Sequence, residues 1–143
     1  MPSELITVAD AVVVALNGAV FSLPFTAKRH YQPLFDLAEM KELHVSVVPK
    51  GIEVSQSGRN TGSFDYKVDI AVQKKFVTDD TSELDPLMVL SEEIAEAFRG
   101  KRLAGYPNAA WVKTEHVSVF AFEHMQELRQ FTSVMTLTFR VTR

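Results

Sequence analysis

The sequence predicts an α+β fold: a mostly antiparallel sheet with two main helices packed on one face and one long β-hairpin. Three observations support this prediction. Two long segments, 63–75 and 131–142, alternate between apolar and polar residues, which is typical of half-buried strands. Two other segments, near 7–18 and 82–98, repeat apolar residues at helical spacing. The 143 residues contain no repeat or linker, so residues 1–143 are expected to form a single domain.

The first half of the chain is predicted to contain one helix and several strands. The helix is expected to start at Thr7, with Asp10 close behind, and to stop at Asn17-Gly18. A short edge strand is expected between the prolines of "PFTAKRHYQP", followed by a short helix or turn in "FDLAEMKEL". "LHVSVV" and "IEVSQS" both alternate, and a turn at 49–51 is expected between them.

The second half begins with the return strand of the hairpin. The loop "GRNTG" joins "IEVSQS" to "SFDYKVDIAVQKK", and two alternating segments around a glycine-bounded loop indicate a hairpin. The second helix is expected to begin at Ser82 or Asp85 and to end at Gly100. "AGYPNAA" is predicted as a loop, "WVKTEHVSV" as a strand and "FEHMQEL" as one or two helical turns before the closing strand.

Composition excludes several classes of protein. A formal net charge of −3 argues against a protein that wraps nucleic acid by bulk electrostatics. The chain has no cysteine, which excludes disulfides, thiolate metal sites and cysteine nucleophiles. The N-terminus lacks the basic region of a secretory signal, and its longest apolar run, Ala11 to Leu16, is far shorter than a membrane span. We expect a soluble intracellular protein that does not contact membranes.

The outer face of the hairpin strand carries acid, base and acid at Asp65, Lys67 and Asp69. A catalytic carboxylate pair is the first function to test for such a face. The Cα atoms of Asp65 and Asp69 are predicted to lie roughly 13 Å apart, from four steps of about 3.3 Å. Paired carboxylates of glycosidases lie about 5 to 9.5 Å apart, so a solvated or interface charge ladder is favoured.

Other catalytic patterns are missing from the sequence. The four histidines do not have metal-ligand spacing, and no GxSxG, GxxxxGK[ST] or GxGxxG segment occurs. We therefore predict no enzymatic activity, no metal and no cofactor. A small basic cluster, Arg99, Lys101 and Arg102, compensates a helix dipole or faces phosphates or an acidic neighbour. Arg59 stands either at a solvated hairpin tip or on an arm that touches a partner.

The order of these segments resembles the tail terminator (tail completion) proteins of long-tailed bacteriophages. The resemblance runs from Thr7 to Val141, and its most telling parts are "AKRHYQP" with "VSVVP", the hairpin "GRN…FDYKVDIAVQKK" and the closing "QFTSVMTLTFRV". It implies a single tail-terminator-like domain in a structural virion protein. Such proteins form a hexameric ring that caps the tail tube, stops its polymerisation and offers a docking surface to head and neck connector proteins.

The resemblance also implies where the partners would bind. Arg59, Asn60 and Thr61 are expected to contact the tail tube protein. Two sets of strand residues are expected at the interface between ring subunits, Asp65, Lys67 and Asp69 on one strand and Thr136, Thr138 and Arg140 on the other. DNA would only pass through the lumen. The expected location is the tail–neck junction of the virion, after assembly in the cytoplasm of the host bacterium.

Three alternatives stay open at this point. The chain could be another head–tail connector component, an adaptor or stopper ring of the phage neck. It could be a small enzyme with an unrecognised site, which would require a deep pocket with convergent titratable groups. It could also be a nucleic-acid adaptor that uses Arg99, Lys101 and Arg102, in which case binding would depend steeply on salt.

Overall fold

The structure, a computed structural model, describes residues 3–31, 42–77, 81–119, 125 and 129–143. It is a mixed α/β fold with two helices and one curled sheet of six strands in the order β1-β2-β3-β6-β5-β4. This confirms the predicted combination of helices with a single sheet. The elements, in chain order, are α1 Glu4–Gly18, β1 Ala27–Arg29, β2 His44–Gln56, β3 Gly62–Lys75, α2 Thr81–Phe98, β4 Arg102–Leu103, β5 Tyr106–Ser118 and β6 Gln130–Thr142.

Helix α1 begins earlier than the sequence indicates. Ser3, not Thr7, is the N-cap, since its hydroxyl accepts from the N–H of Ile6 at 3.4 Å. The predicted end at Gly18 is confirmed. Asn17 then fixes the chain beyond the helix, because its side-chain amide makes two hydrogen bonds to the backbone of Ala27 in β1, of 2.7 and 3.1 Å.

Helix α2 begins at Thr81, so Pro86 lies inside the helix instead of at its first position. It ends at Phe98, followed by Gly100 with a φ of 72°, which glycine adopts without the steric cost of a Cβ. The stop predicted from Gly100 is therefore confirmed. None of the helices in the described ranges is long and apolar enough to cross a membrane.

The sheet is antiparallel except for the short edge strand β1, which pairs parallel with Val45–Val47 of β2. β2 and β3 pair without interruption by a turn, from His44 opposite Gln73 to Gln56 opposite Gly62. The turn predicted at 49–51 is therefore wrong. The register instead shifts between Pro49 and Gly51, so this segment is a bulge within a continuous strand.

Two further predictions in the C-terminal half need correction. The segment predicted as a loop at 104–110 contributes to a strand, because β5 already begins at Tyr106. The two-residue strand β4 was not predicted, and it pairs with the start of β5. The predicted helical segments "FDLAEMKEL" and "FEHMQEL" fall almost entirely outside the described residues.

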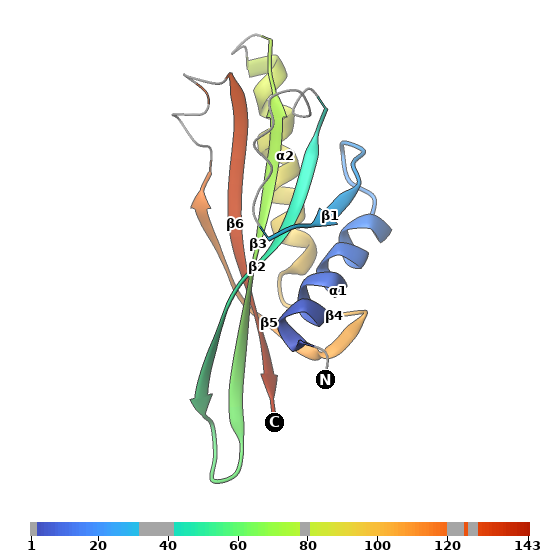
Figure 1. Ribbon diagram of the computed structural model, residues 1–143. Helices are drawn as coiled ribbons and strands as arrows, with labels where there is room; N and C mark the ends of the chain where they lie inside the picture. The colour runs from blue at the N-terminus through green and yellow to red at the C-terminus, as the bar shows by residue number, and fades with distance from the viewer. Residues whose placement is uncertain (1–2, 32–41, 78–80, 120–124, 126–128) are drawn as a thin grey trace.

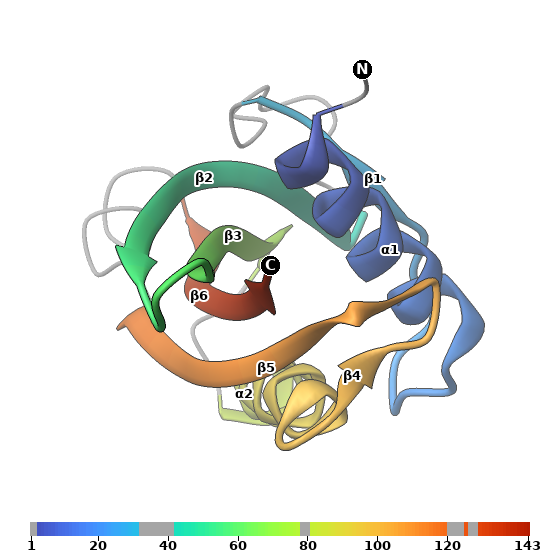
Figure 2. The ribbon, with the colours of Figure 1, turned by 90° about the horizontal axis from the view of Figure 1, so that it is seen from below.

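One buried cluster contains residues of both helices and of the apolar face of the sheet, defined here as the face of Tyr66, Val68 and Ile70. α1 reaches this face through Glu4, which accepts a hydrogen bond from the Tyr66 hydroxyl at 2.8 Å. α2 reaches it through Phe98, whose ring meets Phe139 edge-on at 6.1 Å between centroids. In Figure 2 the sheet is seen along its strands, with β2 and β5 on opposite sides of β3 and β6.

Beyond this core, β2 and β3 continue together as an arm. Figure 1 shows the β2–β3 connection projecting past both chain termini at one end of the molecule. The end of β6 pairs with β3 along the arm, and the C-terminus lies near the far end of its strands, because Gly62 and Arg143 exchange two backbone hydrogen bonds of 2.7 and 3.0 Å. We call residues 51–65 the arm and the helix-packed remainder of the described chain the body.

Candidate interface of the polar sheet face and the arm

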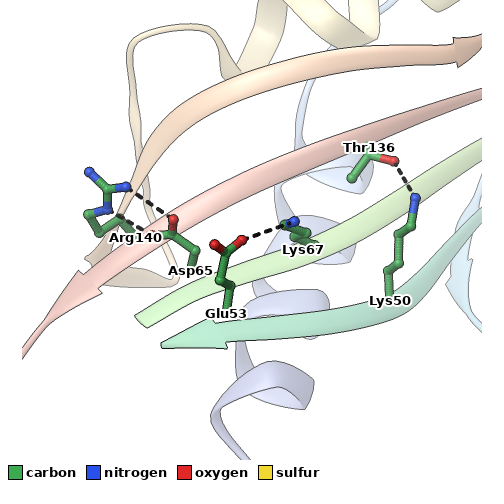
Figure 3. Close-up of polar contacts among 6 residues, drawn as sticks. All are labelled: Lys50, Glu53, Asp65, Lys67, Thr136 and Arg140. Carbon is green, nitrogen blue, oxygen red and sulfur yellow. Dashed lines mark hydrogen bonds and ion pairs between the residues drawn. The ribbon is translucent and has the colours of Figure 1, made fainter. Parts of the chain in front are cut away.

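The acid–base–acid row on β3 lies on the polar face of the sheet, opposite the apolar face. Each of its three residues contacts a neighbouring strand of the same chain, as Figure 3 shows for Asp65 and Lys67. Asp65 contacts β6, Lys67 contacts β2, and Asp69 contacts both of these strands. Such cross-strand pairs stabilise a sheet and fix its register.

Asp65 pairs with Arg140, its register partner on β6. The guanidinium donates from Nε to Oδ1 at 2.8 Å and from Nη2 to Oδ2 at 3.0 Å, which is a bidentate arrangement. The hydrogen bonds to Asp65 raise the pKa of Arg140 above its already high value, so the guanidinium stays charged. The sequence prediction placed both residues at a ring interface, and the structure brings them together within one subunit.

Lys67 and Asp69 connect β3 to its other neighbours. Lys67 forms an ion pair with Glu53 of β2, with 3.3 Å between Nζ and Oε2. Asp69 accepts a hydrogen bond of 2.5 Å from the Thr136 hydroxyl of β6, and its carboxylate lies 3.7 Å from Nζ of Lys50. Lys50 also donates to Oγ1 of Thr136 at 3.2 Å (Figure 3). Lys50, Asp69 and Thr136 thus link β2, β3 and β6.

Thr136 and Thr138 of β6, which are expected at a ring interface, do not form an exposed row. Thr136 and Thr138 are only 4% and 2% exposed. Alternation determines which face a side chain occupies, whereas the twist of the sheet and the long side chains beside it determine whether water reaches it. Oγ1 of Thr138 is buried without a hydrogen-bond partner. Contact of these two residues with another subunit stays a prediction, and it would require access to a covered surface.

The loop Arg59, Asn60 and Thr61 lies at the end of the arm (Figure 1). Arg59 and Asn60 are exposed, and the N–H groups of Ser57 and Gly58 both donate to the carbonyl of Thr61, at 2.9 and 3.2 Å. These bonds hold the loop as a tight connection. It therefore presents a cation and an amide at the end of the projecting arm.

An apolar strip on the arm was not singled out from the sequence. Ile52 and Val54 lie opposite Tyr66 and Phe64 on the apolar face, yet they are 53% and 59% exposed. Phe64 is half-buried, and its ring carries the Arg143 guanidinium at 4.2 Å from the centroid. The alternation of "IEVSQS" did indicate such a face, but it gave no sign that the helices stop short of it.

Groups with potential chemistry in the described residues do not converge on a catalytic set. No cluster of three or more histidines or carboxylates that could hold a metal occurs in these residues. A groove of about 700 Å³ at the base of the arm is lined by Glu4, Trp111 and three arginines. Beside it, burial and the hydrogen bond to Glu4 raise the pKa of Tyr66. The three arginines of the groove all have partners within the protein.

The basic cluster after α2 is partly engaged within the chain. Arg99 pairs with Glu96 at 2.7 Å, and this contact lowers the pKa of that carboxyl. Arg102 donates to the backbone carbonyl of Pro107 at 3.0 Å. Lys101 is exposed. The arrangement agrees with charge compensation near a helix end.

Comparisons with known proteins find similarity among solved structures. No protein-family model matches the chain, and no curated protein matches it. Among solved structures, the chain is similar to the sheath/tube terminator of an extracellular contractile injection system, PVC, in its extended state. The TM-score is 0.51 at 15% sequence identity, and the match covers 100% of this chain and 58% of the other. The chain thus shares the fold of that terminator and spans somewhat more than half of its length.

Proposed function

We propose that this chain is a structural virion protein that caps the end of a bacteriophage tail tube as a ring, most simply a hexamer. In this role it stops tube polymerisation and offers a docking surface to the head and neck connector proteins. The observation that carries the proposal is the likeness in fold, along the whole chain, to a sheath/tube terminator. The sequence resemblance to tail terminator proteins supports it independently.

The mechanism we propose is stoichiometric and requires neither a reaction nor a cofactor. The ring would cover the surface on which the next tube subunit docks. We assign the tube contact to Arg59, Asn60 and Thr61, because this loop ends the projecting arm and its Arg59 and Asn60 are exposed. DNA would pass through the lumen, and a chain with a net charge of −3 would not hold it strongly. The protein would assemble in the host cytoplasm and remain at the tail–neck junction.

The predicted architecture, two helices on one side of the sheet and a long hairpin, gives this proposal its geometry. The body would form the wall of the ring, and the arm would reach the tube. We keep Asp65, Lys67, Asp69, Thr136, Thr138 and Arg140 as candidate residues of the ring interface. Since all but Thr138 contact each other or neighbouring strands within the chain, they would act there by shaping the sheet as well as by direct contact.

The experiment that tests the function is end-capping of purified tubes. Tail tubes assembled from the tube protein of the same particle are incubated with the chain and imaged by electron microscopy. We expect a compact density at one end of each tube and no further elongation after tube protein is added. Binding only to the portal end of heads would identify a neck adaptor or stopper ring instead. Tubes that stay uncapped and continue to grow would refute the proposal.

A further inference from the structure

The outer edge of β2 along the arm has no partner strand among the described residues. β1 covers only Val45–Val47, and the rest of β2 continues for nine residues to Gln56. Its exposed apolar side chains, Ile52 and Val54, lie on this uncovered stretch. An unpaired strand edge with apolar side chains is a site at which another strand can add to the sheet.

The hydrogen-bond pattern shows which backbone groups this edge presents. Ser57 donates to Thr61 within the hairpin, so these two residues form a bonded pair. Bonded and non-bonded pairs alternate along antiparallel strands. Ser55 and Glu53 therefore bond to β3, whereas Ile52, Val54 and Gln56 direct their N–H and C=O groups away from the sheet.

The arm lacks the devices that usually protect such an edge. No proline and no bulge occurs between Ile52 and Gln56, because the register shift at Pro49 lies before this stretch. Its one charged side chain, Glu53, contacts Lys67 on the inner neighbour. Prolines, bulges and outward charges are the usual means of preventing edge pairing. Residues 52–56 thus form a pairing edge that is regular and open.

The opposite side of the sheet has a second open edge, on β5. β4 covers only the start of β5, and the N–H of Trp111 donates outward to the carbonyl of Lys101 at 3.0 Å. Arg143 is bonded to Gly62 of β3, so by alternation Thr136 and Thr138 of β6 bond toward β5. Their partners there are Glu115 and Lys113. Thr114 and His116 consequently direct their backbone groups outward.

We propose that residues 52–56 of β2 in one copy pair antiparallel with residues 113–116 of β5 in the next copy, the stretch that lies between the two register shifts of β5. This inference rests on the proposed ring and names the contact that would close it. Each copy carries both halves of the contact on opposite sides of one sheet, so pairing is head-to-tail, and head-to-tail contacts build rings when the rotation closes. A second copy is thus a partner whose matching edge is present in the structure.

Two geometric conditions for this pairing are met. Within one chain β5 runs antiparallel to β2, so copies that share an orientation bring the two edges together antiparallel. The outward residues of both edges also carry their side chains on the apolar face, since Val54 lies opposite Phe64 and His116 lies opposite Met135. The joined sheets would therefore continue with their helix-packed faces on the same side.

The proposed contact also fixes a displacement between copies. Thr114 lies at the level of Pro49, through Leu137 and Val68. Because the bulge adds one residue to β2, Val54 lies only four register steps beyond Pro49, opposite Phe64, which corresponds to roughly 14 Å at about 3.4 Å per step. Neighbouring copies would be offset by about this length along their strands. The strands would then tilt against the ring axis, as strands do in closed barrels.

Pairwise cross-linking tests the contact directly, because the natural chain has no cysteine. The variant carrying Val54→Cys with His116→Cys, and the one carrying Val54→Cys with Thr114→Cys, sample the two nearest registers. Paired residues would have Cα atoms about 5.5 Å apart, within the range of a disulfide. Mild oxidation of the concentrated protein, alone and with tail tubes, should give a ladder of linked copies on a denaturing gel for at least one pair.

Three controls make the result specific. Val14→Cys with Val54→Cys places one thiol at an exposed position of helix α1 instead of on β5, and this variant should give no ladder. Val54→Pro removes an outward N–H and should lower the yield of native multimers at least about tenfold without lowering the melting temperature. Ser55→Pro removes an N–H bonded to β3 and should lower the melting temperature.

The outcomes separate this inference from the proposed function. Dimers from Val54→Cys alone would show that β2 pairs with itself and would overturn the head-to-tail contact. Unchanged multimers in Val54→Pro, ladders in neither register, or a chain that stays monomeric under all conditions would also overturn it. Capped tubes in those cases would leave the proposed function standing. A ladder without any capping would support the contact and refute the function.

Discussion

The body and the arm use the same strands and the same alternation, but they differ in what covers the apolar face. Val47 and Val54 both belong to β2, and both lie on that face, opposite Ile70 and Phe64. Val47 is fully buried beneath the helices, whereas Val54 is 59% exposed. This difference in exposure indicates that the sheet extends farther than its own helices can cover. Surface left uncovered on a regular strand is surface available to a partner.

The largest expected effect separates these two valines. Val47→Ala removes two methyl groups from the core and should lower the free energy of unfolding by about 2–3 kcal/mol, from lost transfer energy and the cavity left behind. Val54→Ala, the matched control on the same strand and face, should change it by less than about 0.5 kcal/mol. Chemical denaturation monitored by circular dichroism measures both values. Equal losses would mean that the arm is packed as tightly as the body.

The valines also show what sequence alone could predict. Alternation predicted β2, β3 and β6 and the face of each residue, because the two-residue period is a local property. The bulge at Pro49–Gly51 was interpreted as a turn, although the apolar pattern of the sequence changes phase there, as a bulge requires. Apolar residues fall at odd positions up to Val47 and at even positions from Ile52. Pairing with β3 decides between turn and bulge, and that pairing is not local.

The polar face was predicted less completely than the apolar one. The sequence indicated a charge ladder at Asp65, Lys67 and Asp69, and the structure has one. It could not show which neighbour each charge contacts, since strand order is set by long-range pairing. Nor could it show that Thr136 and Thr138 are covered, because burial depends on sheet twist and on side chains from distant segments.

The next effect, in order of size, tests the link between β2, β3 and β6. Thr136→Val keeps the side-chain shape but removes the hydroxyl that donates to Asp69 and accepts from Lys50. Loss of a charge-assisted hydrogen bond at a mostly buried site should cost about 1–2 kcal/mol of unfolding free energy. Thr142→Val, at an exposed position of the same strand and face, is the control and should be near neutral. A neutral Thr136→Val would show that Lys50 alone satisfies the carboxylate.

A smaller effect on stability is expected from the ion pair between Lys67 of β3 and Glu53 of β2. Lys67→Glu places two carboxylates beside each other and should cost about 0.5–1 kcal/mol while the chain stays folded. Adding Glu53→Lys restores opposite charges and should recover most of this loss. The unfolding free energy is measured at low and high salt, and the difference should shrink as salt screens the pair.

The single variant Lys67→Glu and the double variant with Glu53→Lys also test whether Lys67 contacts a neighbouring subunit. Assembly of each variant is followed by light scattering and by capping of tail tubes. If Lys67 contacts another copy, as predicted from the sequence, Lys67→Glu weakens assembly and the double variant regains stability without regaining assembly. Recovery of both properties together would mean that Lys67 acts only within its own chain.

The smallest expected effect on stability, and the largest on function, concerns the end of the arm. Arg59 is exposed at the end of the arm, so Arg59→Ala should change the unfolding free energy by less than about 0.5 kcal/mol. Arg99→Ala is the matched control, because Arg99 is an exposed arginine on the body. If the arm reads the tube end, Arg59→Ala lowers the fraction of capped tubes at limiting protein and Arg99→Ala does not. Equal capping by both variants would assign tube recognition to the body and leave the arm to contacts between copies.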